Sequence, residues 1–450
     1  SVTEPALFAA LWREALWRIT IVGIQRAENT DVLRQAIGAP SWIEPAPAAV
    51  VPEPEVLALG SGAVTVFPGR RPTGAPRVVV VSPYLPFPLS HGGAVRMYNL
   101  LRRAAKDFDQ VLVCFVDELV QAPAELLTLF VEVVYEKRFH THALPSSERP
   151  DMVEEFDSPV VRAALRQTVR KWTPAVAQLE FTHMAQYAEA CRPARTILVE
   201  HDITLDLYGQ LLEQQDDFET RRQYERWERF ERAAWGRVDR VVTMSEKDRL
   251  TVGAPHAEAF ANGVDVERFQ PSGDPTDPGR ILFIGSFAHY PNLLALDFFL
   301  REAWPVLRPL GARLHIIAGS RPDYFLDMYK QRVRPPLDQP GIELEAFVSD
   351  VRPAYRRAAV VIAPLLASAG TNIKIMEAMA MGKAIVSTPA GINGLDELVD
   401  GRDVVVASTG AAMAAEIEAL FTDPARRSAL EREARRTAVR CYDWDVIAER

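Results

Sequence analysis

Residues 360–387 read VVIAPLLASAGTNIKIMEAMAMGKAIVS. Two short apolar runs, Val360–Ala363 and Ala384–Ser387, flank a segment with helical spacing, Thr371–Met381. A strand, a helix and a second strand in this order predict a crossover unit of a parallel sheet. Apolar side chains occupy every side of the predicted helix, so we expect it to be buried all round.

The alternation of apolar runs and helical patterns extends from this unit in both directions, beginning at Arg77. The further runs with the character of strands are Val78–Val81, Val111–Val116, Val131–Val134, Ile197–Val199, Val238–Thr243, Ile281–Ile284, Leu314–Ala318 and Val404–Val406. Continuous apolar runs are typical of strands covered on both faces. About ten such strands exceed one ordinary open sheet. We therefore predict an α/β protein with two Rossmann-like, doubly wound domains.

Changes in composition divide the chain into four predicted segments. These are a helical extension with a Pro/Ala-rich linker (1–75), a first Rossmann-like domain (76–257), a second one (258–430) and C-terminal helices (431–450). An amphipathic helix is predicted in the first half of the extension. We expect the C-terminal helices, anchored by Trp444, to cross back to the first domain.

The overall composition narrows the possible classes of protein. Of the 450 residues, 48% are hydrophobic and 25% are charged, which excludes wholesale disorder, a collagen repeat and a coiled-coil rod. The net charge of −9 argues against a nucleic-acid partner, and no apolar run reaches the length of a membrane span. Three cysteines form no disulfide framework and suit a reducing compartment, so we expect a cytoplasmic protein. Because the chain begins with Ser1 rather than Met, we expect either a fragment of a longer protein or a trimmed chain. The N-terminal 70 residues are then either a linker from a fused preceding domain or an interaction helix.

Polar residues at the start of the Thr371–Met381 helix are the strongest candidates for chemistry. Lys374 and Glu377 lie three residues apart, on one face of an otherwise apolar helix. They either pair with each other or both face a ligand, because buried charges need partners. Backbone amides at Gly370 and Thr371 could hold an anion, and Asn372 could add a hydrogen-bond donor.

Two other segments fall after predicted strands. A Pro-rich loop leads to Gly92 and Gly93, which either form a plain tight turn or allow the backbone to approach a ligand closely. His201 follows the apolar run at Ile197–Val199, and it is either a structural histidine or a group at the site. Ligands of doubly wound folds bind at the carboxyl ends of the strands, where both segments are predicted to lie.

In combination, these motifs resemble the family 4 retaining glycosyltransferases of GT-B fold, from about Arg77 to the C-terminus. The motifs, in order, are Gly92–Gly93 with Arg96, Glu200–Asp202, Val242–Ser245, Asn262–Asp265 with Phe269 and Pro271, Phe283–Ser286, Glu377–Gly382 and Thr388–Gly391. The variant Gly370–Lys374 resembles a bacterial subgroup linked to exopolysaccharide or cell-envelope assembly.

The resemblance implies a donor, a UDP- or GDP-linked sugar, bound mainly by the second domain, and no further cofactor. It implies that Glu377 binds the donor ribose, that His201 is the catalytic histidine near the reacting sugar, and that Arg96 lies on the acceptor side. The residues implied to contact the diphosphate or sugar are Gly92, Gly93, Ser286, Gly370, Thr371, Asn372 and Lys374. The anomeric configuration would be retained without a divalent metal.

Two departures from the family pattern affect the expected site. Ala369 stands where the family has the first glutamate of a Glu-x7-Glu motif that ends at Glu377. The segment Ser286–Asn292 lacks the Arg and Lys that usually grip the diphosphate, and we expect Lys374 to replace them.

The acceptor predicted from the resemblance is a glycan, a lipid-linked sugar or another hydroxyl compound. A lipid-linked acceptor would bring the protein to the inner face of the membrane as a peripheral contact. Two alternatives remain open at this point. A nucleotide-sugar epimerase can share the same fold, and a pseudoenzyme could bind a nucleotide sugar as a scaffold.

Overall fold

The computed structural model describes residues 53–60, 62–89, 92–138, 148–214, 217–368 and 371–449. The helix expected near the N-terminus lies outside these residues. Glu53–Arg450 form one compact unit. Within the described residues, no helix combines the length and the apolar character needed to cross a membrane.

The first sheet has nine strands in the order β1-β2-β5-β4-β3-β6-β7-β8-β9. Their bounds are β1 Glu55–Leu59, β2 Gly62–Pro68, β3 Arg77–Ser82, β4 Asp109–Val116, β5 Phe130–Lys137, β6 Val176–Glu180, β7 Arg195–Glu200, β8 Arg240–Thr243 and β9 Ala257–Ala259. Strands β3 to β9 pair in parallel, whereas β1 and β2 form an antiparallel hairpin that joins β5 antiparallel.

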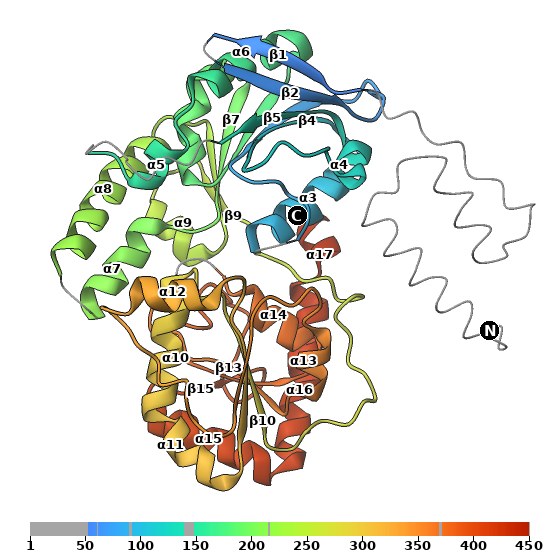
Figure 1. Cartoon of the computed structure of the whole chain (residues 1–450). Helices are drawn as coiled ribbons and strands as arrows, with labels where there is room; N and C mark the ends of the chain where they lie inside the picture. The colour runs from blue at the N-terminus through green and yellow to red at the C-terminus, as the bar shows by residue number, and fades with distance from the viewer. Residues whose placement is uncertain are drawn as a thin grey trace, which may run out of the picture. The chain divides into compact units, whose positions relative to one another are not determined.

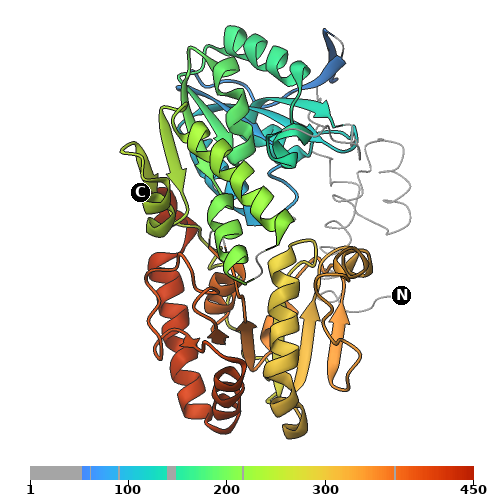
Figure 2. The same ribbon diagram turned by 90° about the vertical axis from the view of Figure 1, so that its left-hand side faces the viewer.

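The second sheet has six parallel strands in the order β12-β11-β10-β13-β14-β15. Their bounds are β10 Arg280–Ile284, β11 Arg313–Ile317, β12 Ile342–Glu345, β13 Val360–Ala363, β14 Ala384–Ser387 and β15 Val405–Val406. Both sheets carry helices on both faces (Figure 1 and Figure 2). The prediction of a doubly wound α/β fold is therefore confirmed.

The helices connect these strands as crossovers. Their bounds are α3 Gly92–Ala104, α4 Ala124–Leu129, α5 Asp151–Glu155, α6 Pro159–Trp172, η1 Thr182–Cys191, α7 Thr204–Gln214, α8 Phe218–Trp235, α9 Glu246–Val252, α10 Tyr290–Glu302, α11 Trp304–Leu307, η2 Arg308–Leu310, α12 Pro322–Tyr329, α13 Arg352–Arg357, α14 Ile373–Ala380, α15 Gly410–Thr422, α16 Pro424–Cys441 and α17 Trp444–Glu449. Helices α10, α11 and α15 pack on one face of the second sheet, and α13, α14 and α16 pack on the other (Figure 1).

Alternate side chains of the central strands enter opposite cores. On β3, Val79 and Val81 face one apolar cluster, whereas Val80 between them faces another. All three are fully buried. This two-sided burial explains why the strand is a continuous apolar run in the sequence.

Each of the ten predicted runs lies on a strand, but five strands escaped prediction. Strand β6 was missed because Gln178 and Glu180 interrupt its apolar pattern. Strand β9 has three residues, and the edge strand β12 carries exposed side chains. Strands β1 and β2 fall inside the segment that was assigned to the linker, so residues 55–68 belong to the first sheet instead.

Of the two C-terminal helices, α17 contacts the first domain and α16 packs on the second. Helix α16 begins at Pro424, where the side chain of Asp423 accepts a hydrogen bond from the amide of Arg426. Helix α17 packs against α3, and Arg103 on α3 pairs with Asp445 on α17 at 2.5 Å. Trp444 is fully buried. A side chain at Gly263 would collide with its ring, so the close approach at this position requires glycine.

Candidate active site at two switch points

The strand order reverses once in each sheet. In the first sheet the chain winds outward from β3 to β4 and β5 on one side, and from β6 to β7 and β8 on the other. In the second sheet the reversal lies between β10 and β13. The crevice beyond the carboxyl ends of such strands is the usual ligand site of doubly wound folds. The segments that carry most of the predicted site residues follow these strands.

Helix α14 begins without a side-chain cap. Its N-cap residue, Asn372, uses its amide group to donate to the Ser368 hydroxyl at 3.1 Å and to the Gly391 carbonyl at 2.6 Å. Asn372 therefore braces two loops instead of capping the helix. Among the described residues, the amides of Ile373 and Lys374 have no hydrogen-bond partner and stay available to an anion, which the helix dipole also favours, whereas the Ile375 amide donates to the Asn372 carbonyl at 3.0 Å. Gly370 lies outside the described residues.

Lys374 reaches from α14 to the end of β10 and the first turn of α10. Its Nζ donates to Oδ1 of Asn292 at 2.8 Å and lies 5.5 Å from the centre of the Phe283 ring. Asn292 in turn donates from Nδ2 to the carbonyl of Ser286 at 2.9 Å. Burial lowers the pKa of Lys374 to about 8, although the charge of Glu377 opposes that shift. The Lys374 ammonium thus bonds to Asn292 of the segment Ser286–Asn292, which contains no Arg or Lys of its own.

Glu377 lies one helical turn beyond Lys374 but does not pair with it. Its Oε2 accepts a hydrogen bond from the Tyr355 hydroxyl at 3.0 Å, and that hydroxyl also lies 3.1 Å from the Lys374 carbonyl. Burial raises the pKa of Glu377 to about 7, against the opposing effects of Tyr355, Arg268 and Lys374. Among the described residues no partner is present for Oε1. Of the two sequence alternatives, direct Lys374–Glu377 pairing is therefore not observed.

The starts of helices α3 and α14 lie against each other. A Cβ atom added at Gly92 would lie 3.1 Å from Cδ1 of Ile373, the first residue of α14. Gly93 is the second residue of α3. The structure thus brings the predicted glycine pair next to the predicted anion site, with both helix N-termini at the contact.

His201 lies at the carboxyl end of β7, buried against two residues that follow each other at the end of β6. Its Nε2 lies 2.7 Å from Oε2 of Glu180. The ring of Phe181 stacks on the imidazole, with centroids 3.9 Å apart and an angle of 12° between the planes. Sequence reasoning missed both partners because β6, the strand that ends at Glu180, was itself not predicted.

Arg96 occupies a different environment from the one expected. It is buried, and its NH1 donates to the carbonyl of Ala261 at 2.7 Å and to Oδ1 of Asn262 at 3.1 Å. Asn262 donates onward to the Thr371 hydroxyl at 2.6 Å. Burial lowers the pKa of Arg96 to about 10, and the charge of Glu180 opposes that shift. Arg96 therefore ties α3 to the connection between the sheets and, through Asn262, to the start of α14.

The segment before α14 is also held from the first domain. Gln210 on α7 accepts from the amide of Ser368 at 3.0 Å and donates to its carbonyl at 3.2 Å. Asn393 donates to the same carbonyl at 2.9 Å. These bonds position the segment between β13 and α14. Ser286, by contrast, is exposed, and its hydroxyl accepts from the amide of Ala288 at 3.3 Å.

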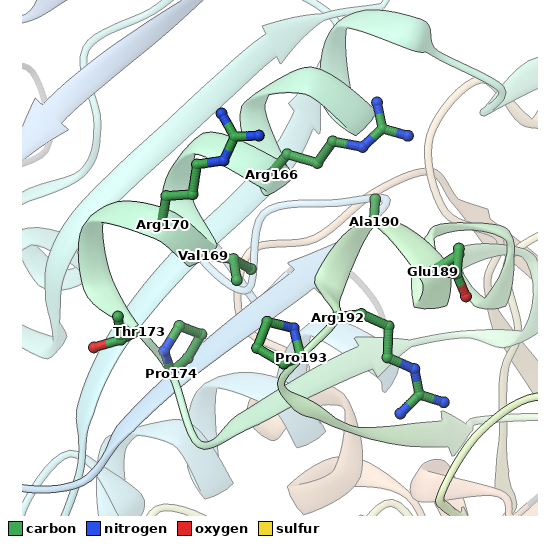
Figure 3. A pocket seen from close by; sticks show the side chains of 9 residues that line it. All are labelled: Arg166, Val169, Arg170, Thr173, Pro174, Glu189, Ala190, Arg192 and Pro193. Carbon is green, nitrogen blue, oxygen red and sulfur yellow. The ribbon is translucent and has the colours of Figure 1, made fainter.

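A cavity of about 520 Å³ lies away from this site (Figure 3). It is lined by Arg166, Val169, Arg170, Thr173, Pro174, Glu189, Ala190, Arg192 and Pro193. These residues lie at the C-terminus of α6 and just before the amino ends of β6 and β7, so the cavity opens at the opposite edge of the sheet from His201. It belongs to neither switch point.

Comparison with known proteins agrees with this arrangement. Residues 278–423, which span the second sheet, match the family model of glycosyl transferases group 1. Among solved structures, sucrose-phosphate synthase from Thermosynechococcus elongatus is similar over 83% of this chain and 96% of that chain, with 15% identity and a TM-score of 0.63. The fold is GT-B. No curated protein sequence matches this chain.

Two further solved structures share the fold. HepE of Anabaena, crystallised with UDP and glucose, aligns over 83% of this chain and 97% of its own, at 14% identity and a TM-score of 0.61. WaaG, a glycosyltransferase involved in lipopolysaccharide biosynthesis, aligns over 82% and 98%, at 14% identity and a TM-score of 0.58. Together with the family match, these similarities support glycosyl transfer as the class of reaction.

Proposed function

We propose that this protein is a retaining glycosyltransferase that moves a sugar from a UDP- or GDP-linked donor to a hydroxyl group of a glycan or lipid-linked acceptor. The observation that carries the proposal is the Lys374 ammonium, which donates to Asn292 in the first turn of α10 beside the uncapped start of α14. A positive side chain next to free helix amides suits a diphosphate. The family match covers all of these residues, which supports the assignment.

Lys374 supplies the charge that the family usually places in the loop after β10. An ammonium has three donors, and Asn292 uses one of them, so two remain for phosphate oxygens. The lysine arrives from α14 rather than from the loop, but its Nζ donates to Asn292, which in turn donates to the Ser286 carbonyl of that loop. This placement supports the expected replacement of the missing Arg and Lys.

Glu377 is suited to the donor ribose. Its Oε2 is held by Tyr355, which fixes the carboxylate, and Oε1 has no partner among the described residues. A fixed carboxylate with a free oxygen can accept hydrogen bonds from a pair of neighbouring sugar hydroxyls. Because the pKa of Glu377 is about 7, the charged form predominates above neutral pH.

Catalysis would then depend on stabilising the leaving nucleoside diphosphate. Lys374 and the facing starts of α3 and α14 concentrate positive potential where that negative charge develops. The charge of the chain itself fills the role that a divalent metal has in other sugar transferases. In the front-face route expected from the resemblance, a donor phosphate oxygen takes the proton of the acceptor hydroxyl, and the anomeric configuration is retained. His201 would contact the reacting sugar.

Nucleotide binding gives the first test. The protein is mixed with UDP, GDP, ADP and their glucose conjugates, with and without magnesium, and thermal unfolding is followed. A ligand at 100 times its Kd stabilises the fold by about 2.7 kcal/mol, which is readily detected. We begin with the uridine compounds because HepE was crystallised with UDP and glucose. We expect one nucleotide to raise the Tm and Glu377→Ala to abolish the rise.

Glu431→Ala is the matched control. Glu431 lies on α16, and burial also raises the pKa of its carboxyl, but it is remote from the start of α14. An equal loss of binding in both variants, or no response to any nucleotide, would contradict the proposed donor site. Binding without turnover would favour a scaffold, conversion of the donor sugar without an acceptor would favour an epimerase, and an inverted product would contradict retention.

A further inference from the structure

Phe181 has a backbone conformation that is rare for its residue type. Its φ is 71°, in the left-handed region that favours glycine, and it is one of three such non-glycine residues in the described parts of the chain. Its amide donates to the Val199 carbonyl at 2.9 Å, so the strand ladder holds the residue in place. Strain of this kind persists where the surroundings enforce it, and it gathers at functional sites. The conformation directs the Phe181 ring onto His201.

The ring of Phe181 and the carboxylate of Glu180 restrain His201 from two directions. The phenyl ring lies nearly parallel to the imidazole at 3.9 Å, which limits rotation of the imidazole. Glu180 receives the Nε2 edge at 2.7 Å, and its other oxygen accepts from Nε2 of Gln178 at 2.5 Å. The side chains of Glu180 and His201 are 2% and 5% exposed. The last residue of β6 and the residue that follows it thus fix the histidine.

The charge of Glu180 is balanced from a third side. The buried guanidinium of Arg96 lies close enough for the Glu180 charge to raise the Arg96 pKa against the effect of burial. Oε1 of Glu180 accepts a hydrogen bond from Gln178, and Oε2 lies against Nε2 of His201. An ionised carboxylate cannot donate, so the proton between Glu180 and His201 must be on Nε2 of the histidine.

We propose that Glu180 is a positioning residue that fixes the Nε2–H tautomer of His201, so that Nδ1 accepts a hydrogen bond from a hydroxyl of the bound sugar. Among the described residues Nδ1 has no hydrogen-bond partner, and it is not one of the fully enclosed unpaired atoms. The proposal rests on the proposed function for the identity of the ligand. The assignment of the Nε2–H tautomer to His201 does not depend on the proposed function.

The tautomer can be measured directly in the protein. Long-range nitrogen–proton NMR distinguishes the two neutral forms, and the signals of His201 are assigned by their loss in His201→Gln. We expect the Nε2–H form in the unmodified protein. An Nδ1–H form, or rapid exchange between the two, would overturn the proposal even if sugar transfer were fully established.

Glu180→Gln provides the functional test. The glutamine amide can donate to Nε2, which favours the opposite tautomer and turns Nδ1 into a donor. We expect the NMR signature to change and kcat to fall roughly tenfold or more, the value of one lost hydrogen bond, while KM for the donor changes little. An unchanged tautomer with unchanged kcat would contradict the role of Glu180.

Glu132→Gln is the matched control. Glu132 is a buried carboxylate of the same sheet, bonded to Lys171 and, at 2.8 Å, to Nε1 of Trp172. We expect it to change stability without changing kcat or the His201 tautomer. If Glu132→Gln lowered kcat as much as Glu180→Gln does, the effect of Glu180 would be structural. If Glu180→Gln fails to fold, the tautomer of His201 in the unmodified protein still decides whether the proposal holds. An inactive protein with the Nε2–H tautomer would contradict only the proposed function.

Discussion

At the β10/β13 switch point, Lys374, Glu377 and the free amides of α14 come from the start of one helix. At the β3/β6 switch point, the corresponding groups come from three separate segments: Arg96 on α3, Glu180 and Phe181 after β6, and His201 after β7. Both sets lie at carboxyl ends of strands, as the topology requires. One set is local in sequence and presents a cation and a carboxylate that do not pair with each other, whereas the other is assembled by folding and balances a buried carboxylate.

The difference shows how each site is stabilised. The α14 set depends on the helix dipole and on short-range contacts to Asn292 and Tyr355, so a single substitution should affect binding more than folding. The second set contains a buried Arg and a buried Glu, and loss of either would leave a charge without compensation. We therefore expect its substitutions to affect folding more than binding.

Arg96→Met should have the largest effect and tests this contrast most strongly. The variant leaves the Ala261 carbonyl and Asn262 without their donor and removes the balancing charge from Glu180. We expect the free energy of unfolding, measured by urea denaturation, to fall by roughly 2–4 kcal/mol. Arg102→Met, on the exposed side of α3, should change it by less than about 0.5 kcal/mol. An unchanged stability with a raised KM for the acceptor would return Arg96 to the acceptor contact predicted from the sequence.

Lys374→Ala should have the next largest effect, on donor affinity rather than on folding. Loss of a charge-assisted bond to phosphate is worth about 2 kcal/mol, or roughly thirty-fold in Kd measured by calorimetry. Lys383→Ala is the control, because Lys383 follows the other end of α14 and donates to the carbonyls of Arg356 and Ala358 instead. Equal nucleotide affinities in the Lys374 variant and the unmodified protein would exclude the proposed phosphate contact.

The pH dependence of donor binding should report on the α14 set alone. Glu377 is ionised above about pH 7 and Lys374 is charged below about pH 8, so affinity should peak between these values. Outside this window, Kd should rise by up to about tenfold per pH unit. Lys374→Arg should remove the alkaline limb, because arginine stays charged. A flat profile would show that neither group titrates in this range.

The same groups affect stability with a definite sign. The pKa of Glu377 is raised by folding from 4.5, so its contribution to stability falls as the pH rises from about 4.5 to about 7. The pKa of Lys374 is lowered from 10.5, so stability rises between about pH 8 and pH 10.5. Both shifts are costs of burial, which is typical of sites that use charge to bind a ligand.

The sequence was sufficient for the features that are local. Apolar runs identified the central strands, and the run 371–381 identified α14 with Lys374 and Glu377 on its face. The sequence was insufficient where the hydrogen-bond partner of a site residue is remote in the chain. Nothing near Lys374 indicates Asn292, which lies 82 positions away, and nothing near His201 indicates Glu180. The sequence predicted Arg96 on the acceptor side. It could not indicate the bonds of Arg96 to Ala261 and Asn262, because these arise only in the folded chain.

Gly92→Ala should have the smallest effect and tests how tightly the two switch points are joined. The new Cβ would lie 3.1 Å from Cδ1 of Ile373, so a flexible side-chain end must move by a few tenths of an ångström. We expect kcat to fall by less than about fivefold and stability to change by less than about 1 kcal/mol, because the space can be recovered by a rotamer change. Ile373→Val removes the contacting methyl group and should restore the activity of the double variant, so that the two effects are not additive. Additive effects would show that the starts of α3 and α14 act independently, and the contrast between the two sites would then concern two separate structures rather than two halves of one.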